Sequence, residues 1–429
     1  MRVVHAGAIY VVANLVSAGI PFLLLPLLTR VLGPAEFGQV VNFFLLVSAC
    51  SALAGLSVHA ALGVAWFKHE RSDLPSLVGS AIVVGIWSTV VVAAVAALAL
   101  GTVGASLGVS PAWGAIAAAT AGCNVLLQCR LVLWQSQQRP LPMACLQIAA
   151  SILNVGLSLA FVLTLGWGGA GRNAGMALSA AVMALVAVVL LLGSRQARPG
   201  LRGQDVSTLL AFGLPLVPHA LAGLLLATAD RFIVSARLGH EALGVYGAGA
   251  QLGAAMVILG DAFVKAFNPW LYARFASDEK DDALGAVGAM YASVPAFVVL
   301  AAAVGGILWL ASSVLLGPAY RAAKEVLPLF MLGGAFNGMY LAVSGLYFFS
   351  GRTALLSSIT LPVAVLGTLA TAMLVPHWGL NGAAAGYAFT QGLLALATWV
   401  VARCAFDLPW NRPTTALGTW WRLATRPAS

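Results

Sequence analysis

The residues of this chain that could do chemistry are a few ionisable side chains set inside long apolar segments. Two of them, Arg130 and Arg231, carry guanidinium groups, which suit phosphate because they donate paired hydrogen bonds. Asp230, Asp261 and Lys265 lie in the second half of the chain. Ionisable groups inside a membrane are costly and usually functional. Cations with few carboxylates predict an anionic substrate.

Structural roles compete with these functional ones. Asp261 and Lys265 are four residues apart and can pair on one helix, and Asp230 can pair with another helix, so these three are structural or coupling candidates. Arg130 and Arg231 either line a pathway or extend to an interface. The other candidates for substrate contact are Arg30, His59, His219, Asn124 and Asn337. The two histidines can equally hydrogen bond between helices, and the two asparagines, expected to be buried, occupy corresponding places in the two halves.

The composition indicates an integral membrane protein. Of 429 residues, 61% are hydrophobic and 8% charged, against about a quarter charged in soluble proteins. This excludes a soluble enzyme, a disulfide scaffold and a disordered chain. The net charge of +9 indicates basic cytoplasmic loops and not a nucleic-acid partner. The five cysteines lie in or beside apolar runs and read as small core residues.

Twelve apolar runs are long enough to be spanning helices, each of about 20 residues. We expect them at residues 8–29, 37–63, 76–101, 112–134, 141–165, 174–193, 208–236, 242–267, 284–316, 325–350, 355–375 and 383–406. The loops predict the orientation, since cytoplasmic loops are rich in Lys and Arg. With a cytoplasmic N-terminus, the inner loops hold 14 Lys and Arg and the outer ones, with Arg30 and Arg172 among them, hold 5. Both termini are therefore predicted to be cytoplasmic.

The chain divides into two similar halves. The long polar connector from Ser194 to Ser207 separates six spans from six, which predicts bundles at 1–200 and 201–429. The motif WGxxGxxxGxA at 167–177 recurs at 378–388, and Leu32-Gly33 with Phe37-Gly38 recurs as Leu238-Gly239 with Leu243-Gly244. Halves of even span number enter the membrane in the same direction. Such repeats predict two bundles about an axis along the membrane normal, a central cavity and alternating access.

Enzymatic motifs are not convincing. The sequence has no phosphate-binding loop of the GxxxxGK type, and the glycines from Gly247 to Gly253 fit helix packing better than dinucleotide binding. The acidic cluster at 278–282 has no soluble catalytic domain around it and reads as a solvated loop. We therefore expect a transporter and not an enzyme, with no metal ion and no cofactor.

Three segments resemble a known family. Residues 25–38 (LPLLTRVLGPAEFG) are similar to the first hairpin of polysaccharide biosynthesis flippases of the Wzx type. Residues 230–233 (DRFI), with LG at 238–239 and GVY at 244–246, resemble the start of that family's second half, and 378–384 (WGLNGAA) its last hairpin. The resemblance implies the superfamily of multidrug, oligosaccharidyl-lipid and polysaccharide exporters. Its drug exporters usually carry a carboxylate in an early helix, which this chain lacks.

The resemblance implies a flippase that moves a polyprenyl-pyrophosphate-linked oligosaccharide from the inner to the outer leaflet of the bacterial plasma membrane. Its implied partners are that substrate, membrane lipid, a polysaccharide polymerase and other envelope assembly proteins. O-antigen, capsule and exopolysaccharide units all remain open as substrates. Two alternatives compete with this function: a cation-coupled multidrug antiporter of the same fold, and a membrane scaffold of an envelope assembly complex.

Overall fold

The computed structural model describes residues 17, 19–20, 22–68, 73–107, 110–275 and 279–425, and these residues form helices and turns without a strand. Nine of the described helices are long and apolar enough to cross a membrane. Two of them, Ala220–Phe275 and Thr353–Ala405, have 56 and 53 residues and are long enough to cross twice. The nine helices thus account for eleven crossings, and the shorter apolar helix Phe22–Val31 overlaps the first predicted span. The chain is thus an all-α, multi-pass membrane protein.

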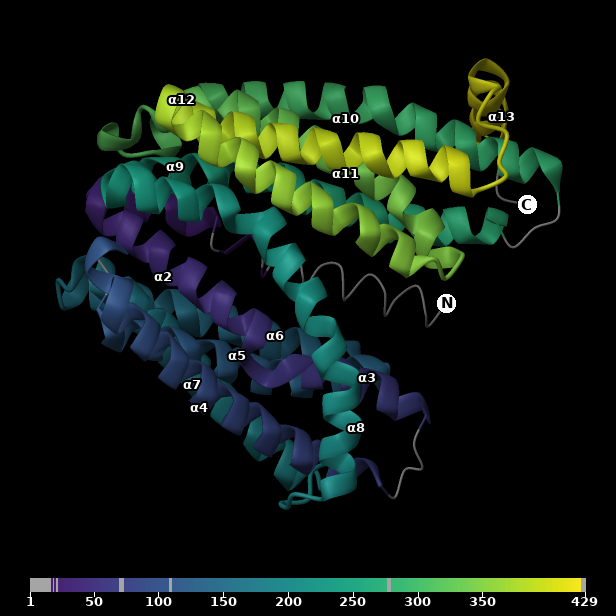
Figure 1. Cartoon of the computed structure of the whole chain (residues 1–429). Helices are drawn as coiled ribbons and strands as arrows, with labels where there is room; N and C mark the ends of the chain where they lie inside the picture. Colours follow the sequence, from purple (N-terminus) through teal and green to yellow (C-terminus); the bar gives the residue numbers. More distant parts are fainter. Residues whose placement is uncertain are drawn as a thin grey trace. The chain divides into compact units, whose positions relative to one another are not determined.

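Residues 1–247 form one compact unit and residues 248–429 a second. The predicted division into bundles at residue 200 stays a prediction. The first unit contains α2 (Pro34–Leu53), α3 (Val58–Lys68), α4 (Leu74–Leu107), α5 (Pro111–Ser136), α6 (Pro140–Leu159), α7 (Gly168–Gly193), α8 (Gly203–Gly213) and the first part of α9 (Val217–Phe275) (Figure 1). The second unit contains the rest of α9, α10 (Lys280–Leu315), α11 (Ala323–Phe349), α12 (Thr353–Ala405) and α13 (Pro413–Thr425).

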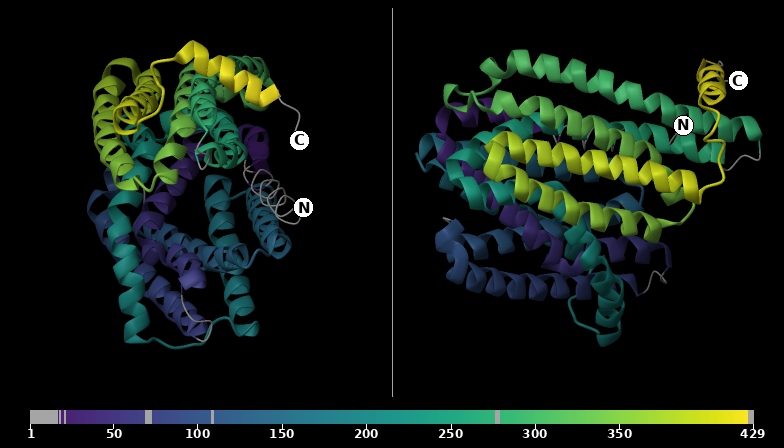
Figure 2. Two further views of the ribbon diagram at one scale, coloured as in Figure 1. Left: turned by 90° about the vertical axis from the view of Figure 1, so that its right-hand side faces the viewer. Right: turned by 45° about the horizontal axis from the view of Figure 1, so that its top comes forward.

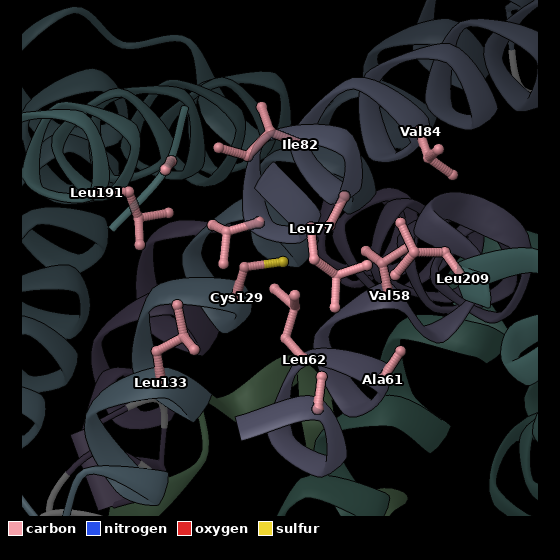
Figure 3. Close-up of a cluster of buried hydrophobic side chains, with 14 of the residues drawn as sticks. Val58, Ala61, Leu62, Leu77, Ile82, Val84, Cys129, Leu133, Leu191 and Leu209 are labelled. Carbon is pink, nitrogen blue, oxygen red and sulfur yellow. The ribbon is translucent and has the colours of Figure 1, made fainter. Parts of the chain in front are cut away.

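The core of the first unit is built from small and branched side chains that fill the space between α3, α4 and α5. Leu62 of α3, Leu77 of α4 and Cys129 of α5 are almost fully buried and point toward one another (Figure 3). Leu191 and Leu209 extend the cluster to α7 and α8. This packing fixes the position of α5, which carries the polar residues Asn124, Gln128 and Arg130.

Glycines allow the two predicted repeats to touch within the first unit. Gly239, with φ +83° and ψ −177°, breaks α9 into two legs, and residues 240–247, at the start of the second leg, lie against α2. Gly38 lies against the carbonyl oxygen of His240, and Gly244 lies against the carbonyl oxygen of Pro34, so closely that neither position has room for a Cβ atom. His240 follows Pro34 by 206 residues, and Gly244 follows Gly38 by the same number. The two copies of the repeat therefore make equivalent contacts with each other.

In the second unit, α10, α11 and α12 lie side by side along their length, and α13 packs on α10 and runs across the ends of α10 and α12 (Figures 1 and 2). α12 is a single long element with one break at Gly379, where φ is +54° and ψ is −131°. The prolines at 328 and 362 lie within α11 and α12 without interrupting the helical backbone.

Candidate substrate site

The second span is not one continuous helix, contrary to the prediction for residues 37–63. A short 3-10 turn at Ala54–Ser57, here called the helix break, separates α2 from α3. Gly55, Leu56 and Ser57 have φ of +74°, +45° and +57°. A left-handed backbone costs a residue other than glycine roughly 1–2 kcal/mol, so the surrounding structure must hold Leu56 and Ser57 in place. Strain of this kind is common at functional sites.

Neighbouring helices fix the helix break. The Gly55 N–H donates a hydrogen bond to Ser88 Oγ of α4 at 2.9 Å, and Ser88 Oγ donates to the carbonyl oxygen of Gly85 at 3.0 Å. Val125 of α5 lies where a Cβ on Gly55 would stand. Apolar clusters centred on Phe43 and on Leu62 pack before and after the break. The break is thus a defined feature of the fold.

A second irregular segment adjoins the helix break. α8 and α9 are separated by a 3-10 turn at Leu214–Leu216 that contains Pro215. Gly213 approaches the carbonyl oxygen of Leu56 too closely for a side chain. Irregular backbone at membrane depth is tolerated where it is buried in protein or lines a water-filled cavity. Here irregular segments from the second and seventh predicted spans meet in one unit.

A polar face of α5 lies beside the helix break. Asn124 and Gln128 are four residues apart, so they share one face, and both side chains are exposed. The prediction that Asn124 is buried was wrong. Val125, next to Asn124, contacts Gly55 of the helix break. We call Asn124 and Gln128 the amide face. Sequence reasoning passed over Gln128, although its spacing from Asn124 was a usable signal.

The histidines and Arg30 differ in their surroundings. His59 lies in the first turn of α3, directly after the helix break, and is half-buried. Its buried Nδ1 atom has no hydrogen-bond partner within the described part of the chain. The His219 side chain lies outside the described residues. Arg30 is exposed near the end of the helix Phe22–Val31.

Arg130 is buried on a different face of α5 from the amides. Its side chain is 3% exposed, its Nη1 donates a hydrogen bond to Gln196 Oε1, and its guanidinium lies 3.9 Å from the ring centre of Trp134. Two residues along a helix turn by about 200°, so Arg130 and Gln128 point to nearly opposite sides. The structure therefore does not bring Arg130 into contact with the amide face. None of its described contacts is a carboxylate.

A second buried guanidinium, Arg172, was expected in an outer loop. α7 begins at Gly168, six residues before the predicted span, so Arg172 lies within the helix and is only 8% exposed. Its Nη1 donates hydrogen bonds to Asn154 Oδ1 at 2.7 Å and Ser158 Oγ at 2.5 Å. The polar pair Arg172-Asn173 lowers the local hydropathy, which hides the true start of the helix. Neither of the described partners is charged.

The adjacent residues Asp230 and Arg231 bond to different neighbours. Asp230 is 5% exposed and accepts a hydrogen bond from the Tyr246 hydroxyl at 2.6 Å. Tyr246 belongs to the second leg of α9, so the carboxylate links the two legs. Arg231 donates from Nη1 to the carbonyl oxygen of Ala227 in its own helix, at 2.6 Å.

The candidates of the second unit bond to their own neighbours. Lys265 and Asp261 form the predicted ion pair at 2.5 Å on an exposed helix surface. Asn337 of α11 donates to Gln391 Oε1 of α12 at 3.2 Å, which ties two helices together. The role of Asn337 in substrate binding and that of Asp261 and Lys265 in coupling remain predictions.

The chain is similar to known transporters. It matches the solved structure of an inward-facing multidrug resistance MATE family transporter of the MOP superfamily, with 14% identity over 90% of this chain and 94% of that one and a TM-score of 0.71. It matches the lipid II flippase MurJ in its inward closed conformation, with 11% identity over 98% and 93% and a TM-score of 0.71. A MATE transporter from Vibrio cholerae matches with 15% identity over 94% and 96% and a TM-score of 0.58.

These likenesses show the fold, a two-lobed arrangement of twelve helices. A search among curated proteins found no significant match. The family comparison is more specific, because the polysaccharide biosynthesis protein family matches residues 3–273, more than half of the chain. The chain therefore belongs to the polysaccharide biosynthesis protein family.

Proposed function

We propose that the chain is a flippase that moves a polyprenyl-pyrophosphate-linked oligosaccharide from the inner to the outer leaflet of the bacterial plasma membrane by alternating access. The observation that carries the proposal is the helix break beside the amide face of α5. It concentrates backbone and side-chain amides where spanning helices are otherwise apolar. Membership of the polysaccharide biosynthesis family and the fold shared with a lipid II flippase support the same function.

The chemistry of the site suits a glycan headgroup. Sugars and pyrophosphate cannot cross hydrocarbon unaided, because burying unpaired polar groups and charges is costly. Exposed amides such as Asn124 and Gln128 donate to and accept from hydroxyl groups. The half-buried His59 adds a ring nitrogen next to the helix break. We assign the oligosaccharide to this face.

Arginine supplies the charge that the pyrophosphate needs. Arg130 is bonded to neutral Gln196 and stacked on Trp134, so its positive charge is not neutralised by a described contact. Because it points away from the amide face, we assign it to attraction of the anionic headgroup through its field and not to direct contact in this conformation. Arg231 is held by a carbonyl oxygen and is assigned the same role.

A multidrug antiporter is the competing function, since MATE transporters share the fold. A cation-coupled antiporter needs carboxylates that exchange protons or sodium. In the first unit Asp230 lies in a buried hydrogen bond with Tyr246, whereas the amides Asn124 and Gln128 of α5 are exposed. The polar surface therefore favours a glycan over a cationic drug.

The deciding experiment uses a strain that lacks this protein and follows its lipid-linked oligosaccharide in spheroplasts. We expect the unit to be protected from an added impermeant glycosidase, and wild-type protein to restore its digestion. The double variant Asn124→Leu with Gln128→Leu should fail to restore it, whereas Asn124→Gln with Gln128→Asn, which keeps both amides, should succeed. Digestion without the protein would refute the flippase, and added sensitivity to cationic compounds would favour the antiporter.

Orientation is tested separately. We propose that both termini are cytoplasmic, on the excess of basic residues in the inner loops. Topology reporters fused at Arg198 and at the C-terminus should both report cytoplasm, and one fused at Gly166 should report the outside. A periplasmic signal at Arg198 would reverse the assignment of faces.

A further inference from the structure

The C-terminal helix α13 does not follow the direction of the spanning helices. It packs on the first turns of α10 and lies across the ends of α10 and α12 (Figure 2). A helix perpendicular to spanning helices, at the level where those helices begin and end, lies in the plane of the membrane surface. Such interfacial helices bind lipid through an apolar face with basic residues beside it.

The connection to α13 holds the helix in this direction. Trp410 is buried, its carbonyl oxygen accepts a hydrogen bond from the Tyr291 hydroxyl at 2.8 Å, and its ring packs against Tyr291 and Trp399. Arg403 at the end of α12 donates to Asn411 Oδ1 at 3.2 Å. Tryptophan and tyrosine are enriched at the membrane–water interface, which places this cluster at the headgroup level.

One face of α13 is seated on the protein. Ala416 and Thr419 are fully buried, and two glycines of α10, Gly285 and Gly288, leave room for Leu423 and for the backbone of Ala416. The seat is specific, because a side chain at Gly288 would collide with the Ala416 carbonyl group.

The remaining surface of α13 has an apolar side and a polar side. Leu417 and Trp421 are four residues apart, 37% and 64% exposed, and lie on one side. Gly418 and Arg422 are exposed next to this side, about 100° and 140° round the helix from Leu417, and the exposed Thr415 lies about 160° from Leu417. Arg412 is exposed at the start of the helix. From Arg403 to Thr425 the chain has three arginines and one aspartate, so this edge of the protein is positive.

We propose that α13 is a membrane-surface helix that inserts Leu417 and Trp421 into the headgroup region while Arg412 and Arg422 contact anionic lipid headgroups. The apolar side alone would fit a protein partner as well. The basic residues beside it, the crossing direction and the aromatic cluster at the same level select an anionic lipid surface. This inference is independent of the transported substrate.

The test measures the surroundings of α13 in the full chain. The five cysteines are replaced, single cysteines are placed at 415, 417, 418 or 421, and a spin label on each is read in nanodiscs of phosphatidylcholine with phosphatidylglycerol. Labels at 417 and 421 should collide mainly with oxygen, which concentrates in lipid. The label at the matched position 415 should collide mainly with a water-soluble nickel chelate, and the label at 418, between the two sides, should give an intermediate ratio of collisions.

Two further arms separate the parts of the proposal. Arg412→Glu with Arg422→Glu should weaken the lipid contact of the 417 label by roughly fivefold per arginine in anionic nanodiscs, and should change little in pure phosphatidylcholine. Gly288→Leu should lift α13 from its seat and abolish the difference between 417 and 415 without altering α13. Nickel collisions at all four positions, or shielding of 417 and 421 from both reagents by a protein, would overturn the proposal, and charge-independent insertion would overturn its anionic part.

Discussion

The hairpin of α6 and α7 and the two legs of α12 have glycines at the same positions of their repeat but differ in their polar residues. The Trp-Gly motif of each opens with a glycine in the left-handed region, Gly168 with φ +55° and Gly379 with φ +54°. Further along, Gly175 lies against the backbone of Ser158, and Gly386 lies against Thr371. Small residues let two helices approach closely in a membrane. The repeat is therefore preserved in its glycines.

The polar groups are not repeated. In the first hairpin, Arg172 is buried and bonded to Asn154 and Ser158. From Trp167 to Trp378 the repeat offset is 211 residues, and the positions that correspond to this cluster are apolar: Val365, Leu369 and Ala383. The second copy closes the same hairpin without a charge. The buried guanidinium is thus an addition to the hairpin and is not needed to form it.

The largest effect is expected from closing the glycine contacts. Gly175→Leu places a side chain where the Ser158 N and Cα atoms lie within 2.7 Å of the Cβ position, and Gly386→Leu meets Thr371 Cβ at 2.8 Å. Each should lower the unfolding free energy by about 3 kcal/mol, as overpacking does. The thermal unfolding midpoint in detergent measures this. Gly156→Leu in α6, where no atom lies within 4 Å, is the matched control, and equal stability of Gly175→Leu and Gly156→Leu would contradict the comparison.

The sequence predicted the parts of the fold that follow from apolar runs and from repeated glycines. Twelve spans and the Trp-Gly repeat both have a strong pattern, because a spanning helix needs about 20 apolar residues. The helix break has no such sequence pattern, since Ala54–Ser57 contains one glycine and lies inside an apolar run. The hydropathy pattern also wrongly predicted that Arg172 lies in a loop. Hydropathy is an average over a segment, whereas the hydrogen bonds that Arg172 donates to Asn154 and Ser158 allow its guanidinium to be buried.

For the candidate site, the residue types were predicted and their directions were not. Asn124 and Arg130 were both assigned to substrate, yet they lie on different faces of α5. The sequence spacing of six residues does not show which face packs on α6 and α7. The direction of the Arg130 side chain depends on Trp134 and Gln196, which contact its guanidinium inside the protein.

An intermediate effect is expected from the Arg172 cluster. Arg172→Ala leaves the Asn154 and Ser158 oxygens without their donor, and Asn154→Val removes an acceptor from a buried guanidinium, so each should cost about 2 kcal/mol. The triple variant Asn154→Val, Ser158→Ala, Arg172→Ala makes the cluster apolar, as it is in the second hairpin. It should recover most of that loss, since replacing a whole buried polar group by apolar residues is often neutral. A triple variant less stable than either single one would show that the hairpin depends on its charge.

The smallest expected effect is a difference in stability of about 1 kcal/mol between substitutions of the two left-handed glycines, Gly168 and Gly379. Gly168→Ala and Gly379→Ala should each cost about 1–3 kcal/mol through backbone strain. Gly168 has an additional neighbour, because a Cβ there would collide with the Glu36 carboxylate, whereas no atom lies within 4 Å of the Gly379 position. The same carboxylate accepts the hydrogen bond of the Gly33 N–H at 3.3 Å, at the start of α2.

Displacing Glu36 should remove that bond and add about 1 kcal/mol to the cost of Gly168→Ala alone. A double-mutant cycle isolates this coupling, because in the Glu36→Ala background the costs of Gly168→Ala and Gly379→Ala should become equal. Unfolding midpoints of the four Gly168 and Glu36 combinations, with the corresponding Gly379 set as control, provide the measurement. If the extra cost of Gly168→Ala persists without the carboxylate, the two glycines differ in backbone strain, and the hairpins are less alike than their φ angles indicate.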